Sequence, residues 1–163
     1  MLIVFAGPAC SGKSTLAAEI ARRRSLPHLS MDATRQRILP NAAHTREDRA
    51  AAYRAMHFAV ELLLAAGAGA VLDAPYNQPA DCAELDRISA ARYKLIECHV
   101  SPETAIARLH ARGWPDPTRP DLTDDRVRHL VTTHPYRNTG LSLDTDSLSP
   151  AECLARIEAF LEP

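Results

Sequence analysis

The residues best suited to chemistry stand together near the N-terminus, in the run 7–15, which reads G-P-A-C-S-G-K-S-T. This run fits the phosphate-loop pattern G-x-x-x-x-G-K-[ST], in which glycines let backbone N–H groups converge on phosphate oxygens. A helix that begins at the end of the run would add the partial positive charge of its N-terminus. Lys13 can then reach the β- and γ-phosphates of a nucleoside triphosphate, and the Ser14 hydroxyl can ligate Mg²⁺.

A glycine-rich turn that only starts a helix is the alternative for the same run. Lys13 argues against it, because Lys94 is the only other lysine in a chain with 19 lysines and arginines together. We therefore expect ATP and Mg²⁺ as ligands of this segment. The predicted contacts to the nucleotide come from Gly7, Ala9, Cys10, Ser11, Gly12, Lys13, Ser14 and Thr15.

Asp32 and Arg35 form a second group of candidate residues, directly after a short expected strand at 28–30. A carboxylate here would face the γ-phosphate and could accept the proton of an attacking hydroxyl, while Arg35 could bind a phosphate or an anionic acceptor. Asp32 also has a purely structural alternative, because Asp often N-caps a helix, here one over 35–39. Spacing alone leaves both roles of Asp32 open.

A third candidate, Asp73, ends an apolar run and is followed by Ala74 and Pro75. Motor ATPases usually carry an acidic residue directly after this Asp to orient water, and its absence favours transfer to a bound acceptor over hydrolysis. The chain has no N-K-x-D motif, which a GTPase would use to read the base. With 163 residues it is also too short for a motor module with an added helical domain.

Arg108 and Arg112 are spaced i, i+4 at the end of an expected helix, just before a proline-rich segment at 114–120. A cation on this helix face could close over the γ-phosphate and stabilise the charge of the transition state. The alternative is a solvated arginine pair that complements the helix C-terminus. We expect a short lid at about 108–121. The later segment 134–138 is either a plain connection or a contact to acceptor or adenine.

Alternating strands and helices must position these residues. Short apolar runs predict the strands, and helical spacing with capping residues predicts the helices. The expected strands are 2–6, 28–30, 70–73, 93–100 and 141–144, and the longer helices are 14–24, 45–66, 79–91, 102–112, 122–133 and one from 150 onwards. This alternation predicts an α/β fold with a parallel sheet covered on both faces. Ligands of such folds bind at the carboxyl ends of the strands, where Gly7, Asp32, Asp73 and Asp144 would meet.

The motifs occur in the same order in one known family. From residue 2 to about 161, the chain resembles the P-loop kinases that include the kinase domain of bacteriophage polynucleotide kinase, the zeta toxins and chloramphenicol phosphotransferase. The resemblance is carried by the phosphate loop, D-x-x-R at 32–35, Asp73 and R-L-x-x-R-G at 108–113. It implies a P-loop NTPase-type three-layer sandwich with a five-stranded parallel sheet in the order 2-3-1-4-5.

The resemblance also implies roles for these residues. Asp32 corresponds to the general base and Arg35 to a residue that contacts the acceptor or a phosphate. Asp73 corresponds to a carboxylate that binds the acceptor or, through water, Mg²⁺. Arg108 and Arg112 match lid arginines, of which Arg112 best matches the one that closes on the transferring phosphate.

Thr145 follows the last strand, where relatives place the adenine. Together these features predict a kinase that moves the γ-phosphoryl group of ATP to a hydroxyl of a small molecule, such as a metabolite, nucleoside or antibiotic. A polynucleotide 5′-hydroxyl is the alternative acceptor. A nucleotide-dependent switch or adaptor with little transfer activity is the alternative of another class.

Composition limits the remaining possibilities. A length of 163 residues predicts one domain over 1–163, and a net charge of −1 argues against a strongly basic nucleic-acid-binding surface. Four cysteines without a C-x-x-C pair indicate reduced thiols and a cytoplasmic protein. No secretory signal is visible, and no apolar run reaches the ~18–20 residues that span a bilayer. The sequence does not indicate a protein partner.

Overall fold

The computed structural model describes residues 1–40, 45–113 and 121–162, and it contains one parallel five-stranded sheet. The strands are β1 (Leu2–Ala6), β2 (His28–Ser30), β3 (Ala70–Asp73), β4 (Lys94–His99) and β5 (Leu141–Asp144). Their order is β2-β3-β1-β4-β5, which confirms the predicted topology. Register places Asp73 beside both Phe5 and Ser30, so the carboxyl ends of the central strands meet at one edge.

β1 is the centre of the sheet and is buried on both faces. Leu2, Val4 and Ala6 pack on one side, and Ile3 and Phe5 pack on the other. This alternation follows the two-residue period of a strand. An uninterrupted apolar sequence is therefore what a strand covered by helices on both faces requires.

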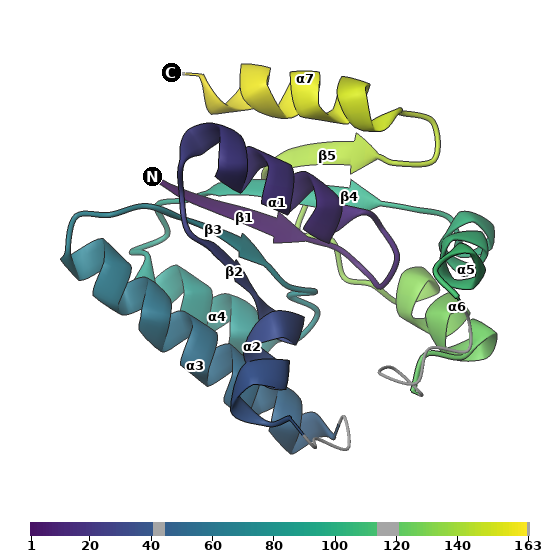
Figure 1. The fold of residues 1–163 in the computed structure, drawn as a ribbon, viewed down its shortest axis with the longest axis horizontal. Helices are drawn as coiled ribbons and strands as arrows, with labels where there is room; N and C mark the ends of the chain where they lie inside the picture. Colours follow the sequence, from purple (N-terminus) through teal and green to yellow (C-terminus); the bar gives the residue numbers. More distant parts are fainter. Residues whose placement is uncertain (41–44, 114–120, 163) are drawn as a thin grey trace.

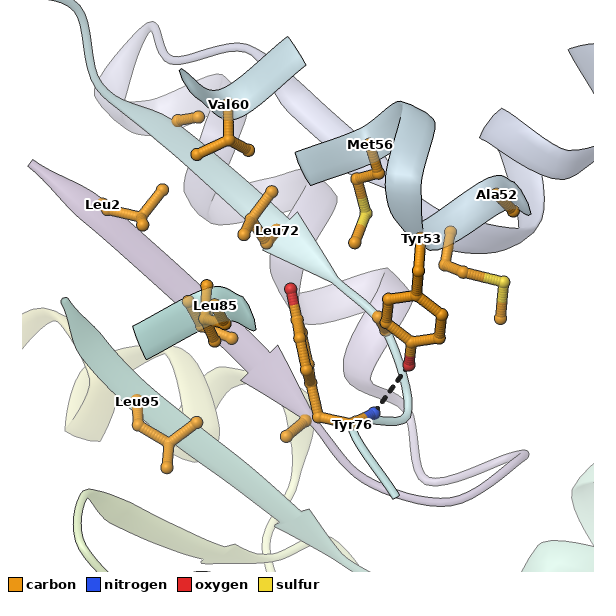
Figure 2. Packing of buried hydrophobic residues seen from close by; sticks show 14 residues of the cluster. Leu2, Ala52, Tyr53, Met56, Val60, Leu72, Tyr76, Leu85 and Leu95 are labelled. Carbon is orange, nitrogen blue, oxygen red and sulfur yellow. Dashed lines mark hydrogen bonds between the residues drawn. The ribbon is translucent and has the colours of Figure 1, made fainter. Parts of the chain in front are cut away.

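Helices cover the two faces of the sheet in separate layers (Figure 1). On one face lie α1 (Lys13–Arg24) and α7 (Pro150–Leu161). On the other lie α3 (Arg46–Ala65) and α4 (Pro79–Ile88), with Met56 and Leu85 packed towards Leu72 of β3 (Figure 2). No helix within the described ranges combines the length and apolarity of a bilayer span.

Three further helices stand at the carboxyl edge of the sheet, where a ligand would bind. α2 (Met31–Ile38) directly follows β2 and packs against α3. α5 (Pro102–Ala111) and α6 (Asp124–Thr132) pack against each other around a third apolar cluster that includes Cys10 of the phosphate loop. This cluster attaches α5 and α6 to the side of the edge that carries the phosphate loop.

Capping residues define several helix starts as predicted. Thr45 and Asp48 form a capping box on α3, and Ser149 and Glu152 form another on α7. Ser101 caps α5 through a hydrogen bond from the Thr104 N–H. Each such cap satisfies backbone donors that the first helical turn leaves unpaired.

Some predicted boundaries were wrong for local reasons. The helix expected over 79–91 ends at Ile88, because Ala90 and Ala91 adopt left-handed φ values of 49° and 53°. The helix expected from 122 begins at Asp124, because the Thr123 hydroxyl accepts the Arg126 N–H as an N-cap. The strand expected over 93–100 is shorter by a residue at each end. Most of the predicted lid, residues 114–120, lies outside the described residues.

Candidate active site

The phosphate loop connects β1 to α1 at the carboxyl edge of the sheet. Gly7 has φ 147°, and a Cβ there would stand 2.7 Å from the Cys98 carbonyl oxygen and 2.9 Å from Ser11 Oγ. Gly12 has φ 83° and forms the N-cap of α1. A side chain at residue 7 would collide with β4, and one at residue 12 would strain the turn, so both glycines are required by geometry. The first turn of α1 then begins with Lys13 and Ser14.

Lys13 is largely buried, with 8% of its surface exposed, and its Nζ donates to the Pro8 carbonyl oxygen at 3.4 Å. The Lys13 side chain therefore folds back towards the phosphate loop, and its ammonium group lies beside Pro8. Ser14 and Thr15 are exposed on the same turn, and Ser11 is buried inside the loop. The Lys13 ammonium group therefore lies beside the loop N–H groups and the N-terminus of α1, and all three favour a bound anion.

Arg108 holds the phosphate loop from the side of α5. Its guanidinium donates to the Cys10 carbonyl oxygen at 3.2 Å, to Thr145 Oγ1 at 3.0 Å and to the Thr145 carbonyl oxygen at 2.6 Å. The Thr145 hydroxyl in turn donates to the His99 carbonyl oxygen at 2.9 Å. Arg108 therefore links α5, the loop and the end of β5, and the polar atoms of Thr145 are engaged within the protein.

Cys10, the residue that Arg108 contacts, has φ 61°. Non-glycine residues rarely adopt this left-handed conformation, and doing so costs on the order of 1 kcal/mol or more. The Arg108 hydrogen bond to the Cys10 carbonyl helps to hold the residue in this conformation.

Asp73 ends β3 and is almost completely buried, at 2% exposure. Within the described part of the chain, neither carboxylate oxygen has a hydrogen-bond partner, and the Nε2 of His28 lies 3.8 Å from Oδ2. A buried carboxylate without hydrogen bonds is costly unless a cation or ordered water compensates it. The Asp73 carboxylate and the exposed Ser14 hydroxyl both carry the kind of oxygen donor that Mg²⁺ prefers, so the donor chemistry fits a magnesium ion.

One pocket joins the phosphate loop to the start of α2. Among the described residues that line it are Ala9, Cys10, Gly12, Lys13, Ser14, Asp32, Arg35 and Arg112, all predicted from the sequence. Gly7, Ser11, Thr15, Asp73, Arg108 and Thr145 were also predicted, but they lie outside this lining. The phosphate loop, Asp32 and Arg112 thus line one pocket. Arg108 and Thr145 lie outside the pocket lining, where Arg108 contacts the loop through Cys10.

The structure rejects the N-cap alternative for Asp32. α2 begins one residue earlier, at Met31, so Ser30 holds the N-cap position, without a side-chain hydrogen bond. Asp32 lies in the first turn instead, its side chain 45% exposed, with Oδ1 3.9 Å from Nε of the buried Arg35. The sequence left both roles of Asp32 open because Ser30 and Asp32 are both good capping residues, and the backbone selects the earlier one. The expected bounds of this helix, 35–39, were wrong, since it runs over Met31–Ile38.

Two polar pocket residues, Arg49 and Asn77, carried no clear sequence signal. Arg49, on α3, donates to Asn77 Oδ1 at 3.5 Å, and both line the pocket. The preceding residue, Tyr76, has φ 49°, and its N–H donates to the buried Tyr53 hydroxyl at 2.9 Å (Figure 2). This bond fixes the turn that presents Asn77. Only the position of Asn77, shortly after a strand end, could have indicated it.

His134 also lines the pocket, near Lys13. It is the first residue of the segment 134–138, for which a site contact was one of the two alternatives. Its ring packs edge-on to Tyr136 at 4.5 Å between centroids, and Tyr136 stacks on His99 at 3.7 Å. Burial lowers the pKa of His134 to about 4, and the Lys13 charge acts in the same direction. The imidazole is therefore neutral at physiological pH and adds no charge to the pocket.

Solved structures with the same architecture include several kinases. The chain superposes on a sugar kinase from Janibacter sp. HTCC2649 with a TM-score of 0.76 and 17% identity, covering 98% of this chain and 93% of that one. For a gluconokinase from Sinorhizobium meliloti, the values are 0.75 and 19%, covering 98% and 90%. For an APS kinase from Mycobacterium tuberculosis, they are 0.76 and 18%, covering 99% and 97%. At these identities the likeness shows the fold.

No curated protein matches the sequence. A protein family described as an AAA domain matches residues 2–134, a range that includes the phosphate loop, Asp32, Asp73 and Arg112. The match covers most of the chain and all the predicted site residues except Thr145, so the chain belongs to this AAA domain family, with a P-loop NTPase-like α/β fold.

Proposed function

We propose that this protein is a kinase of one domain over residues 1–163, which transfers the γ-phosphoryl group of ATP to a hydroxyl of a small molecule. The observation that carries the proposal is the shared pocket, which has a phosphate loop on one wall and a carboxylate, Asp32, on the other. Three structural neighbours bear kinase names, two of them for the small acceptors gluconate and APS. Within the P-loop kinases, we also propose that the chain belongs to the group that includes polynucleotide kinase, the zeta toxins and chloramphenicol phosphotransferase.

The donor wall binds and polarises ATP. Backbone N–H groups of the loop and the start of α1 bind the phosphate oxygens, and Lys13 neutralises charge on the β- and γ-phosphates. Ser14 and Asp73 would hold Mg²⁺, which supplies further charge neutralisation when bound. The uncompensated oxygens of Asp73 support that role.

The acceptor wall activates the hydroxyl. The acceptor oxygen forms a bond to the γ-phosphorus while the bond from that phosphorus to the β,γ-bridging oxygen breaks and ADP leaves. The hydroxyl proton passes to the Asp32 carboxylate, which is exposed enough to reach a bound acceptor. Arg112, the C-cap residue of α5, lines the same pocket and would stabilise charge on the transferring group.

Transfer of radiolabel from [γ-³²P]ATP tests the proposal directly. The acceptors are a panel of small hydroxyl compounds and, separately, a 5′-hydroxyl oligonucleotide. We expect a labelled small-molecule product that requires Mg²⁺ and is lost in the Lys13→Ala variant. Label on the oligonucleotide alone would select the polynucleotide alternative. Tight ATP binding with no labelled product in either arm would reject a kinase and favour a nucleotide-dependent switch.

A further inference from the structure

The connection between α6 and β5, residues 133–140, reaches the pocket through His134. This pocket lies between the phosphate loop and Asp32, so it is the space that a γ-phosphoryl group would occupy during transfer. The inner phosphates of a nucleotide bind instead to the N–H groups of the loop itself. His134 belongs neither to the loop nor to α2, and its place in the lining lets it meet the outermost phosphate.

β4 fixes the backbone that follows His134. The carboxylate of Glu97, a β4 residue with only 1% exposure, accepts the N–H groups of Arg137 and Asn138, both at 2.7 Å. Hydrogen bonds to an ionised acceptor are about twice as strong as those between neutral groups. The connection is therefore attached firmly to the sheet, a few residues beyond the side chain that enters the pocket.

Aromatic contacts orient the imidazole ring of His134. Tyr136 stacks on His99, the last residue of β4, and its hydroxyl donates to the Cys98 carbonyl oxygen at 3.4 Å. The His134 ring then packs on Tyr136 at an interplanar angle of 62°. Edge-on pairs at this separation are favourable. The ring is therefore held in one orientation by the protein before any ligand binds.

The ring nitrogens of His134 remain available to a ligand. Within the described part of the chain, neither nitrogen makes a hydrogen bond, although the residue is half-buried. Burial, and then the charges of Lys13 and His99, lower its pKa to about 4, so the imidazole is neutral. A neutral imidazole carries one N–H donor and one acceptor nitrogen. The pocket thus contains an oriented, neutral donor near the Lys13 ammonium group.

We propose that His134 is a phosphate-binding residue, which donates its ring N–H to the γ-phosphoryl group of the bound nucleoside triphosphate. This inference rests on the nucleotide-binding part of the proposed function and adds a contact from outside the phosphate loop. A neutral donor suits the position, because Lys13 and Arg112 already bring two positive charges to the pocket. ADP lacks the γ-phosphoryl group and cannot make this contact, so His134 favours the triphosphate over the diphosphate.

Binding of two nucleotides that differ only in the outermost phosphate tests the proposal. Calorimetry gives the Kd values of ADP and of the β,γ-imido analogue of ATP, each with Mg²⁺, for the parent and for His134→Phe. Phenylalanine keeps a ring to pack on Tyr136 but has no nitrogen. We expect the Kd of the analogue to rise by about 10-fold or more, while the Kd of ADP changes by less than about 2-fold.

Two further variants separate the hydrogen bond from the packing of the ring. His134→Gln should keep part of the preference for the analogue, because its amide supplies an N–H donor without an aromatic ring. His129→Phe is the matched control, because His129 is exposed on α6 and lies outside the pocket lining. Both Kd values should stay at the parent level in this control. Circular dichroism verifies that each variant is folded.

The outcomes separate this inference from the proposed function. An unchanged ratio of the two Kd values in His134→Phe overturns the γ-phosphate contact and leaves the kinase intact. Equal weakening of ADP and of the analogue also overturns it, since that pattern indicates a purely structural role for the ring. A preference for the analogue that depends on His134, in a protein that transfers label to no hydroxyl compound, supports the contact and overturns the kinase function alone.

Discussion

The two walls of the pocket are built in different ways. The donor wall is a continuous stretch of chain, and its shape comes from backbone geometry: Gly7 fits under the Cys98 carbonyl, and Arg108 clamps Cys10. The acceptor wall is assembled from α2, α3 and the turn after β3, and it presents side chains such as Arg49 and Asn77. In the proposed kinase, a few exposed or partly exposed side chains would therefore select the acceptor that meets the γ-phosphate.

This difference separates catalytic competence from selectivity. A change in the donor wall disturbs main-chain positions that β4, α5 and β5 also fix. A change at Arg49 alters a side chain while leaving the buried face of α3, including Met56 and Val60, in place. If the proposed function holds, acceptor preference would change by substitution on one wall without rebuilding the nucleotide site. Single substitutions can therefore perturb each wall separately.

Lys13→Ala should give the largest effect, because it removes the main cation of the donor wall. Removing such a preorganised electrostatic group typically lowers kcat by about 10²–10³-fold, and loss of γ-phosphate binding adds to this. Among the described residues its one hydrogen bond is a long one, to the Pro8 carbonyl oxygen, so thermal unfolding should change little. Label transfer and circular dichroism measure the two quantities. Full activity in a folded variant would contradict the donor-wall assignment.

Asp32→Asn should damage the acceptor wall selectively. Loss of a general base typically lowers kcat by about 10²–10⁴-fold, while the Kd of ATP should stay nearly constant. The substitution is a fair test because Asp32 is not the N-cap of α2, and its contact to Arg35 is long. Steady-state kinetics and nucleotide calorimetry provide the comparison. An unchanged kcat would contradict the role of general base and leave Asp32 as an acidic residue that stabilises the first turn of α2.

Arg108→Ala should weaken nucleotide binding by about 10-fold, because three hydrogen bonds to the loop and to Thr145 are lost. The double variant Arg108→Ala with Cys10→Gly should recover part of this affinity. Glycine adopts the left-handed conformation of residue 10 without strain, so it depends less on the Arg108 contact. Calorimetric Kd values for the four proteins of this cycle measure the coupling. Additive effects would show that Arg108 and residue 10 act independently.

His134 should give the smallest effect, a dependence of stability on pH. Its pKa is lowered to about 4 from a model-compound value of 6.5, so the unfolded chain binds a proton at higher pH than the folded one. The stabilisation is complete above about pH 6.5 and is lost progressively as the pH falls towards 4. Urea unfolding at pH 7, 5.5 and 4.5 should show a shallower decline in His134→Gln than in the parent. His57 is also buried with a lowered pKa, so some decline should persist.

Local chemistry made much of the architecture predictable. The phosphate loop can be identified from nine consecutive residues, 7–15. The bounds of β3 and β5 agree with the expected strands because short apolar runs and turn residues define them. The acceptor wall was only half predictable. Asp32 and Arg35 could be predicted because they directly follow a strand. The role of Arg49 could not be predicted, because only the packing of α3 against α2 and the tertiary contact to Asn77 place it at the pocket.

The order of the strands has a consequence for how the chain reaches this fold. β1 is synthesised before its hydrogen-bonding partners, β3 and β4, which lie about 65 and 90 residues further along the chain. At typical synthesis rates its five apolar residues wait roughly 5–20 s for both neighbours. During that interval both edges of the strand lack their native partners, and unpaired strand edges favour aggregation and chaperone capture. A strand that is fully buried in the native molecule therefore spends part of its synthesis with both edges unpaired.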